Sequence, residues 1–284
     1  MNLPDSAPDD AAYPRSQAYN PEWLRANGFG SNPLVIAEWL SRATRLAPGM
    51  RVLDLGCGRA TSSIFLAREF GVQVWATDLW VSARSNLARI REARVADRVF
   101  PIHADARNLP FAPEFFDAVL CHDSFMYFGT DALYLNYLAS FVPPGGLLGF
   151  AQAGLVREIG PEGVPEHLKT WWTQDLWGLH TADWWRSLWE RTGIVAIETA
   201  DTMPDGNRRW LDWHRFLFPD GSDEIRAIEA DAGRTIGYVR VVARRRAEAK
   251  LEEYAWPKTL AAMIDEHATQ SLLRSDAPRQ IDAP

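Results

Sequence analysis

The sequence predicts an α/β fold: a three-layer sandwich in which a mostly parallel, seven-stranded sheet carries helices on both faces. Short apolar runs that are typical of buried strands alternate with segments of helical spacing from Val52 onward. This alternation is typical of βαβ units and of a parallel sheet. A third observation sets one part of the chain apart, because eight of the 13 tryptophans fall between Trp171 and Trp213. We expect a tryptophan-rich lid inserted after the fifth strand.

The chain ahead of the first strand has two parts. Residues 1–18 are acidic and proline-rich, which predicts a mobile tail. Residues 19–46 carry the aromatic side chains of Tyr19, Trp23 and Phe29 and then apolar residues at helical spacing. Two interpretations stay open for this leading segment: it folds over a ligand, or it covers the edge of the sheet.

The chain is organised around residues 52–63, VLDLGCGRATSS. A strand over 52–55 runs into Gly56-Cys57-Gly58, and a helix over 60–69 follows directly. The glycines permit a tight turn and let a ligand approach the positive end of the helix. Asp78 ends the next strand, 72–78, about 20 positions on, where an acidic residue holds a ribose. The sequence therefore predicts a nucleoside-containing ligand.

The remaining elements follow in order, and the glycine- and proline-rich stretch after the fifth strand interrupts them. Strands are expected at 99–103, 115–121, 147–152, 194–199 and 235–243, and helices at 82–95, 130–141, 182–191 and, for most of its length, 210–231. The predicted division is a tail at 1–18, a binding core at 19–152, the lid at 153–180, the rest of the core at 181–246, and a helical tail at 247–284.

Two details of the glycine loop indicate which nucleoside binds. A dinucleotide fingerprint, G-x-G-x-x-G, would have glycine where Thr61 stands. Asp54 would repel a pyrophosphate beside the loop, whereas it could pair with the amino group of a ligand that has no phosphates. S-adenosylmethionine is such a ligand.

Five motifs in the expected order carry a resemblance to a known family. They are Asp54 to Gly58, Asp78, His103 to Ala106, Phe116 to Leu120, and Pro143 to Gly146. With these motifs the chain resembles the class I S-adenosylmethionine-dependent methyltransferases over residues 19–152. The resemblance implies a Rossmann-like fold, S-adenosylmethionine as the cofactor, and methyl transfer to a small molecule.

The resemblance also implies where the cofactor lies. Its methionine end is expected near Asp54 and Gly56, its ribose at Asp78, and its adenine near Asp105 and the loop after the fourth strand. Asp105 could instead cap a local turn, and the two cysteines are expected mainly as small packing residues. The predicted cofactor-binding set is Asp54, Gly56, Cys57, Gly58, Thr61, Asp78, Leu79, Asp105, Ala106, Cys121 and His122.

Methyl transfer from a sulfonium is an in-line displacement, so the protein must mainly position the acceptor and exclude water. A general base is needed only if the acceptor loses a proton, as a hydroxyl does, and not for a thioether or a free amine. The candidate catalytic residues are His122, Asp123, Tyr127 and His180. Each has a structural alternative: His122 or Asp123 could serve only to order the loop after the fourth strand, and His180 could be a capping or packing residue at the hinge of the lid.

Departures from related subfamilies narrow the reaction. The Asp/Asn-Pro-Pro-Tyr sequence of enzymes that methylate DNA bases or protein glutamine is replaced here by Cys121 to Ser124. Met126 and Tyr127 stand where fatty-acid cyclopropane synthases carry a Glu-His pair. Both activities are therefore disfavoured.

Composition limits the partners. The formal net charge of −7 disfavours electrostatic binding to nucleic acid. The sequence contains no apolar run long enough to span a membrane and no export signal, so a cytoplasmic location is expected. The two cysteines suggest neither a disulfide framework nor zinc, and no metal is expected.

The tryptophans suggest both a structure and an acceptor. Most of the eight are expected to form the core of the lid, while Trp171, Trp172 or Trp177 could line a pocket for an aromatic, apolar or amine-bearing acceptor. Two other functions stay open: a nicotinamide-dependent oxidoreductase, and a protein that binds S-adenosylmethionine without catalysis. The sequence does not indicate an oligomeric state.

Overall fold

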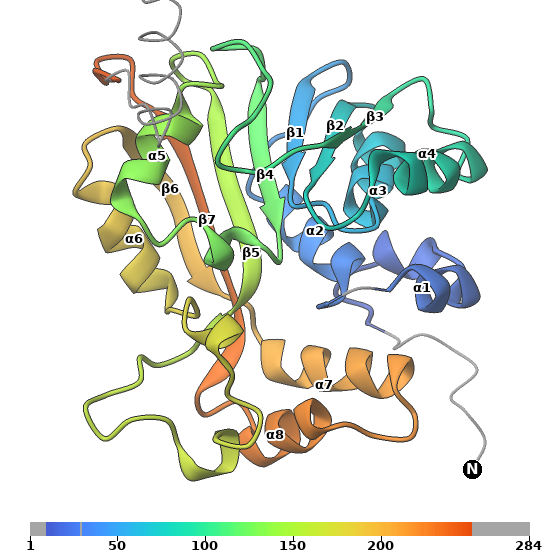
Figure 1. The fold of residues 1–284 in the computed structure, drawn as a ribbon, viewed down its shortest axis with the longest axis vertical. Helices are drawn as coiled ribbons and strands as arrows, with labels where there is room; N and C mark the ends of the chain where they lie inside the picture. Colours follow the sequence, from blue (N-terminus) through green and yellow to red (C-terminus); the bar gives the residue numbers. More distant parts are fainter. Residues whose placement is uncertain (1–9, 29, 252–284) are drawn as a thin grey trace, which may run out of the picture.

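The computed structural model describes residues 10–28 and 30–251 and contains a seven-stranded sheet (Figure 1). The strand order is β3-β2-β1-β4-β5-β7-β6, and β7 is antiparallel to both of its neighbours. The mostly parallel seven-stranded sheet is therefore confirmed. The strands are β1 (Arg51–Leu55), β2 (Gln73–Asp78), β3 (Val99–His103), β4 (Ala118–His122), β5 (Leu147–Leu155), β6 (Val195–Thr202) and β7 (Ile236–Arg245).

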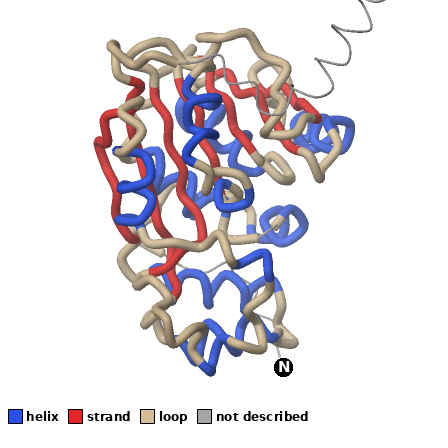
Figure 2. The backbone as a smooth tube through the Cα atoms, turned by 60° about the vertical axis from the view of Figure 1, so that its left-hand side comes forward, coloured by secondary structure: helices blue, strands red, loops and turns tan. Residues whose placement is uncertain are grey.

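Helices cover both faces of this sheet, which confirms the three layers (Figures 1 and 2). Helices α2 and α3 contact each other, and α5 and α6 contact each other on the opposite face. Side chains that cap helix N-termini fix several starts, such as Ser82 for α4 and Thr181 for α6. The helices are α1 (Pro21–Asn27), α2 (Pro33–Ser41), α3 (Thr61–Phe70), α4 (Ala83–Glu92), α5 (Ala132–Ala139), α6 (Ala182–Glu190), α7 (Gly206–Leu217) and α8 (Asp223–Asp231).

The core lies around the central strands, where every residue of β4 and β5 is buried. Trp185 and Trp189 of α6 are fully buried and pack against Phe125 and Phe150 with ring centroids 5.0 to 5.6 Å apart. These two tryptophans therefore hold α6 on the sheet. Their role is structural, as expected for most of the eight.

The insertion after β5 packs with α7 and α8 into a lobe beyond the carboxyl end of β5, which we call the C-terminal lobe: residues 156–181 and 206–231 (Figure 1). Strand β5 extends to Leu155, three residues past the predicted end, because Ala153, Gly154 and Leu155 continue the pairing with β7. Residues 156–181 contain two short 3-10 helices, Glu166–Leu168 and Gln174–Leu176.

The two predicted tails are only partly described. Residues 10–18 pack on the core, since Tyr13 and Ser16 are buried and the Ser16 amide donates to Glu38 Oε2 at 2.9 Å. The expectation of a mobile tail is therefore wrong for these nine residues, and residues 1–9 lie outside the described part. Residues 247–251 form a turn and irregular chain rather than the start of a helix, and residues 252–284 also lie outside it. Within residues 10–28 and 30–251, no helix has the length and apolar character needed to span a membrane.

Candidate active site

The site lies where the strand order reverses. Strands β1 and β4 are neighbours although two strand-helix units separate them in the chain. In open α/β sheets, ligands bind outside the carboxyl ends of strands at such a reversal. Gly56 follows β1, while Asp78 and His122 are the last residues of β2 and β4, so these three residues meet at one edge of the sheet.

Two adjoining cavities occupy this edge. The larger has a volume of about 240 Å³ and the smaller about 110 Å³. The cavities share part of their walls, so a single elongated ligand can extend through both. The shared residues are Gly56, Asp78, Trp80, Ser124 and Tyr127.

The glycine loop forms one wall of the larger cavity, but its amides are used within the protein. The amides of Gly56 and Cys57 donate to the Thr77 carbonyl, and the Gly58 amide donates to Asp78 Oδ2 at 2.8 Å. The expected ligand contact with these three amides is therefore not available. The first turn of α3, which includes Thr61, also lines the cavity. The first amides of any helix have no hydrogen-bond partner inside the helix.

Asp78 lies at the junction of the two cavities. Its carboxylate accepts hydrogen bonds from three backbone amides, those of Gly58, Trp80 and Val81, at 2.7 to 2.8 Å. A carboxylate offers about four lone-pair sites, so one remains for a ligand hydroxyl. The backbone thus fixes the carboxylate where the sequence predicts a ribose.

Asp54 lies behind the cavity wall rather than in it. Its side chain is fully buried, and its carboxylate accepts hydrogen bonds from Ser62 and Ser63 at 2.7 and 2.5 Å. His122 Nδ1 donates to the other carboxylate oxygen at 2.8 Å. Burial opposes ionisation of Asp54, but the nearby His122 and the hydrogen bonds outweigh it, so the pKa of Asp54 is lowered.

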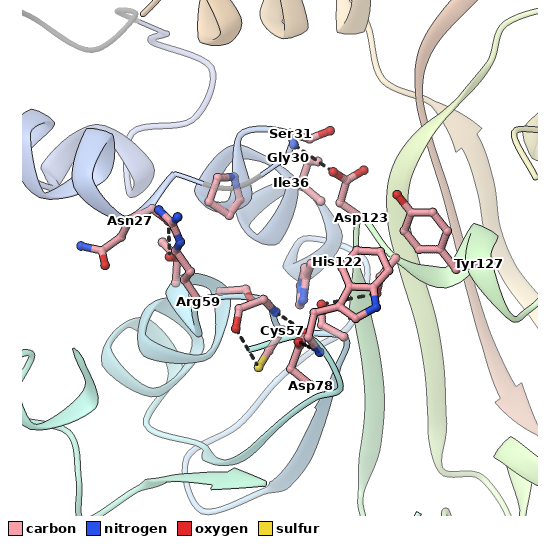
Figure 3. A pocket seen from close by; sticks show the side chains of 17 residues that line it. Asn27, Gly30, Ser31, Ile36, Cys57, Arg59, Asp78, His122, Asp123 and Tyr127 are labelled. Atoms are coloured by element: carbon pink, nitrogen blue, oxygen red, sulfur yellow. Dashed lines mark hydrogen bonds between the residues drawn. The ribbon is translucent and has the colours of Figure 1, made fainter. Parts of the chain in front are cut away.

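These hydrogen bonds change the interpretation of Asp54 as a group that contacts the cofactor. Because the carboxylate already bonds His122 and the two serines and does not line the cavity, it is not the group that meets the ligand's amino group. Asp54 instead holds His122, which lines the larger cavity (Figure 3).

The loop after β4 places three predicted catalytic residues in the cavity wall: His122, Asp123 and Tyr127. Asp123 Oδ2 accepts from the Ser31 amide at 2.8 Å, and Oδ1 accepts from the Ala153 amide at 3.0 Å. Burial raises the pKa of Asp123, and these hydrogen bonds oppose that shift only in part. Asp123 therefore ties its loop to two other segments, as its structural alternative expected.

Tyr127 stands at the mouth, with 39 % of its surface exposed, and its ring lies 5.3 Å from that of Trp80. Burial, together with the negative charges of Asp123, Asp175 and Glu224, raises the pKa of Tyr127 to about 12. Its hydroxyl therefore stays protonated at neutral pH and can donate a hydrogen bond. Trp80 was not among the predicted site residues, although it follows Asp78 by two positions.

His180, the fourth predicted catalytic residue, lies outside both cavities. Its ring stacks on Trp184 with centroids 3.6 Å apart, and its Nδ1 lies 3.1 Å from Glu158 Oε2. The alternative interpretation of His180 as a packing residue at the lid hinge accounts for these contacts, and the structure does not bring it to the site.

The smaller cavity gathers the residues expected around adenine. Leu79, Asp105 and Ala106 line it together with Phe128. Asp105 also accepts a hydrogen bond from the Arg107 amide at 2.8 Å, so it caps a turn while facing the cavity. Cys121, by contrast, lines neither cavity, and its thiol packs against the Ser124 hydroxyl at 3.0 Å.

The leading segment closes the larger cavity from above. Asn27, Gly30, Ser31 and Ile36 line it, so this segment covers the pocket rather than only the sheet edge (Figure 3). Arg59 donates to the carbonyls of Ala26 and Gly28, both at 3.1 Å. Hydrogen bonds from Arg59, in the loop between β1 and α3, therefore hold this segment over the cavity.

Tryptophans of the C-terminal lobe support the site from outside. Trp213 is fully buried and donates to the Gly30 carbonyl at 3.0 Å. Trp171 packs against Trp210, whereas Trp177 is 71 % exposed. None of Trp171, Trp172 and Trp177 lines the two cavities. In the part of the chain that the structure describes, no group of three His, Cys, Asp or Glu residues is placed to hold a metal ion.

The comparisons with known proteins agree with this geometry. Residues 52–146 match the family model described as a methyltransferase domain. This part of the chain is a methyltransferase domain. The resemblance that the motifs carried is thereby confirmed at the level of the family, and the match does not support the nicotinamide-dependent oxidoreductase that the sequence left open.

Individual relatives lie at modest similarity. The methyltransferase GfsG of Streptomyces halstedii is 28 % identical over 60 % of this chain and 63 % of its own length. The 2-methyl-6-phytyl-1,4-hydroquinone methyltransferase of Synechocystis is 27 % identical over 66 % of this chain and 60 % of its own length. The chain thus spans less than two thirds of these relatives.

A solved structure shares the fold. Phosphoethanolamine N-methyltransferase 2 of Haemonchus contortus, in complex with S-adenosylmethionine, superposes with a TM-score of 0.63 at 20 % identity. The match covers 84 % of this chain and 59 % of that one. At this identity the likeness supports the Rossmann-like architecture of the domain and not a particular acceptor.

Proposed function

We propose that this protein transfers the methyl group of S-adenosylmethionine to a small-molecule acceptor by in-line displacement. The observation that carries the proposal is the pair of adjoining cavities that meet at Asp78. The smaller suits a flat adenine, the carboxylate of Asp78 suits the ribose, and the larger suits the charged methionine end. The membership of residues 52–146 in the methyltransferases supports the same ligand.

The acceptor would approach from the side of Trp80 and Tyr127, where the shared wall of the two cavities is most exposed. An in-line displacement needs the accepting atom about 3 to 3.5 Å from the methyl carbon. The Tyr127 hydroxyl, which stays protonated at neutral pH, would orient the acceptor through a donated hydrogen bond. The two aromatic rings would exclude water from the reacting atoms.

The predicted catalytic groups in the wall do not offer a free base at this mouth. The imidazole of His122 is buried and held by Asp54, and both carboxylate oxygens of Asp123 accept backbone hydrogen bonds. Tyr127 remains protonated. We therefore favour an acceptor that reacts without a strong base, such as a free amine or a thioether.

An isotope-transfer assay tests this function. The protein is incubated with S-adenosylmethionine that carries a labelled methyl group and with the small-molecule fraction of a cell extract, alongside an amine, a thioether, a thiol and a phenol. We expect S-adenosylhomocysteine to form together with a labelled product whose mass increases by one methyl group. Binding of S-adenosylmethionine without S-adenosylhomocysteine formation from any fraction would instead identify a protein that binds the cofactor without catalysis.

A further inference from the structure

His122 presents an unpartnered nitrogen to the larger cavity. Its side chain is 3 % exposed, its Nδ1 is engaged by Asp54, and its Nε2 is buried with no hydrogen-bond partner among the described residues. Leaving a buried polar atom without a hydrogen-bond partner is unfavourable. Such an atom in the wall of a binding cavity indicates a partner on the ligand.

The charge of the Asp54–His122 pair indicates which kind of ligand group would bond Nε2. Asp54 is fully buried, and its lowered pKa keeps it ionised. A neutral imidazole beside it would leave one uncompensated negative charge in the interior, which is costly. The buried pair is therefore best balanced when His122 carries a proton on each nitrogen, so that Nε2 is a donor.

The position of this donor matches an anion site at the start of α3. Ser62 belongs to the first turn of α3, and its hydroxyl bonds the same carboxylate that holds His122. The Asp54 carboxylate thus connects the imidazole to the first turn of α3. The N-terminus of a helix is its positive end, and the first-turn residues Thr61 and Ser62 line the same cavity as His122. A buried cationic donor and a helix N-terminus together favour a ligand carboxylate.

We propose that His122 Nε2 donates a hydrogen bond to the carboxylate at the methionine end of the cofactor, with Asp54 as the positioning residue that orients the imidazole and balances its charge. This inference rests on the proposed function, because it assumes a cofactor with an amino-acid end. It assigns His122 to binding rather than to proton abstraction from the acceptor. Ser62 and Ser63 support the arrangement by fixing Asp54.

Calorimetry with two ligands tests the assignment. S-adenosylhomocysteine carries the carboxylate, and its decarboxylated analogue, the adenosyl 3-aminopropyl thioether, keeps the amino group but lacks the carboxylate. Since a hydrogen bond to a charged group contributes about 1.5 to 3 kcal/mol, the unmodified protein should bind S-adenosylhomocysteine about 10-fold to 100-fold more tightly than the analogue. His122→Asn keeps an N–H donor near the position of Nδ1 but has no group at the position of Nε2, so it should lose most of this preference while binding the analogue as before.

Two further variants complete the design. Asp54→Asn does not alter any group that touches the ligand, yet it should reduce the same preference, because the imidazole loses its counter-charge. His167→Asn is the matched control, since His167 bonds Asp231 in the C-terminal lobe at 2.9 Å and lines neither cavity. Its preference should equal that of the unmodified protein.

The outcomes separate this inference from the proposed function. An equal loss of affinity for both ligands in His122→Asn would show a merely structural role, and an unchanged preference would show no contact; either result overturns the inference. No binding of S-adenosylhomocysteine by the unmodified protein would overturn the proposed function. If His122→Asn does not fold, ¹⁵N NMR of the unmodified protein decides. The His122 Nε2 resonance should shift on addition of S-adenosylhomocysteine but not of the analogue, and equal shifts would contradict the assignment.

Discussion

Replacing Asp54 with alanine should destabilise the protein far more than its single negative charge suggests. The substitution leaves the buried His122 imidazole without its acceptor and frees the hydroxyls of Ser62 and Ser63. Removing one partner of a buried ion pair costs about 3 to 5 kcal/mol. Because a domain is commonly stable by only about 5 to 15 kcal/mol, Asp54→Ala should remove a large share of the free energy of unfolding.

Urea unfolding followed by tryptophan fluorescence measures this loss, since five tryptophans of the described residues are buried. The matched variant replaces both partners, Asp54→Leu with His122→Phe. Replacing both members of a buried pair by apolar groups is often close to neutral, so the double variant should recover most of the stability. A loss below about 1 kcal/mol in Asp54→Ala would refute the reasoning, because it would mean that the pair contributes no more than a surface contact.

Three other predictions follow from the same geometry. Gly56→Ala should weaken both stability and S-adenosylhomocysteine binding, because Gly56 has φ +70° and an added Cβ would lie 2.7 Å from Ser124 Cβ. The control is Gly49→Ala, at φ +84° with open space around it, which should lower the free energy of unfolding by only about 1 to 2 kcal/mol in thermal unfolding. Equal effects of the two substitutions would contradict the steric argument. Asp78→Asn should weaken S-adenosylhomocysteine binding about 10-fold or more, since hydrogen bonds to charged groups contribute about 1.5 to 3 kcal/mol. Calorimetry measures the affinity, and Asp97→Asn, at an exposed position, is the control. An unchanged affinity in Asp78→Asn would remove Asp78 from the ribose site. Burial lowers the pKa of His214 from 6.5 to about 4, and the adjacent Glu224, whose pKa burial raises to about 7, is uncharged in that range and supplies no counter-charge. The unfolded chain takes up the His214 proton first, so the contribution of His214 to stability falls by about 3 kcal/mol as pH drops from about 6.5 to 4, at 1.36 kcal/mol per pH unit. The raised pKa of Glu224 has the opposite effect, because the folded protein takes up that proton first between about pH 7 and 4.5. His214→Phe removes only the first contribution, so this variant should gain stability relative to the unmodified protein as pH falls, and a constant difference between their urea-unfolding free energies from pH 6.5 to 4 would contradict the reasoning.

The sequence predicted the parts of the fold that local patterns encode. The strand, glycine turn and helix around Gly56 and the later strand-helix units lie close to the predicted ranges, because apolar periodicity and turn residues act over a few positions. The location of the site followed as well, since parallel strands end at one edge. Asp78, at the end of β2, lines both cavities at this edge, and its contact with a ribose stays a prediction.

The rest depended on contacts between distant segments. Asp54 and His122 are 68 residues apart, and they meet because Asp54 pairs with Leu120, which puts His122 on the same face of the sheet. Only the register between β1 and β4 reveals this pairing. Likewise, nothing in the local sequence shows that His180 turns toward Glu158 and Trp184 rather than toward the site, or that Trp80 stands at the mouth.

A crystal structure of this protein with S-adenosylhomocysteine tests the central claim most directly. The account predicts that the ribose hydroxyls contact the carboxylate of Asp78, that the adenine lies beside Asp105 and Ala106, and that the amino-acid end enters the larger cavity. Electron density for the nucleoside outside these two cavities, or a ribose out of hydrogen-bond reach of Asp78, would contradict it.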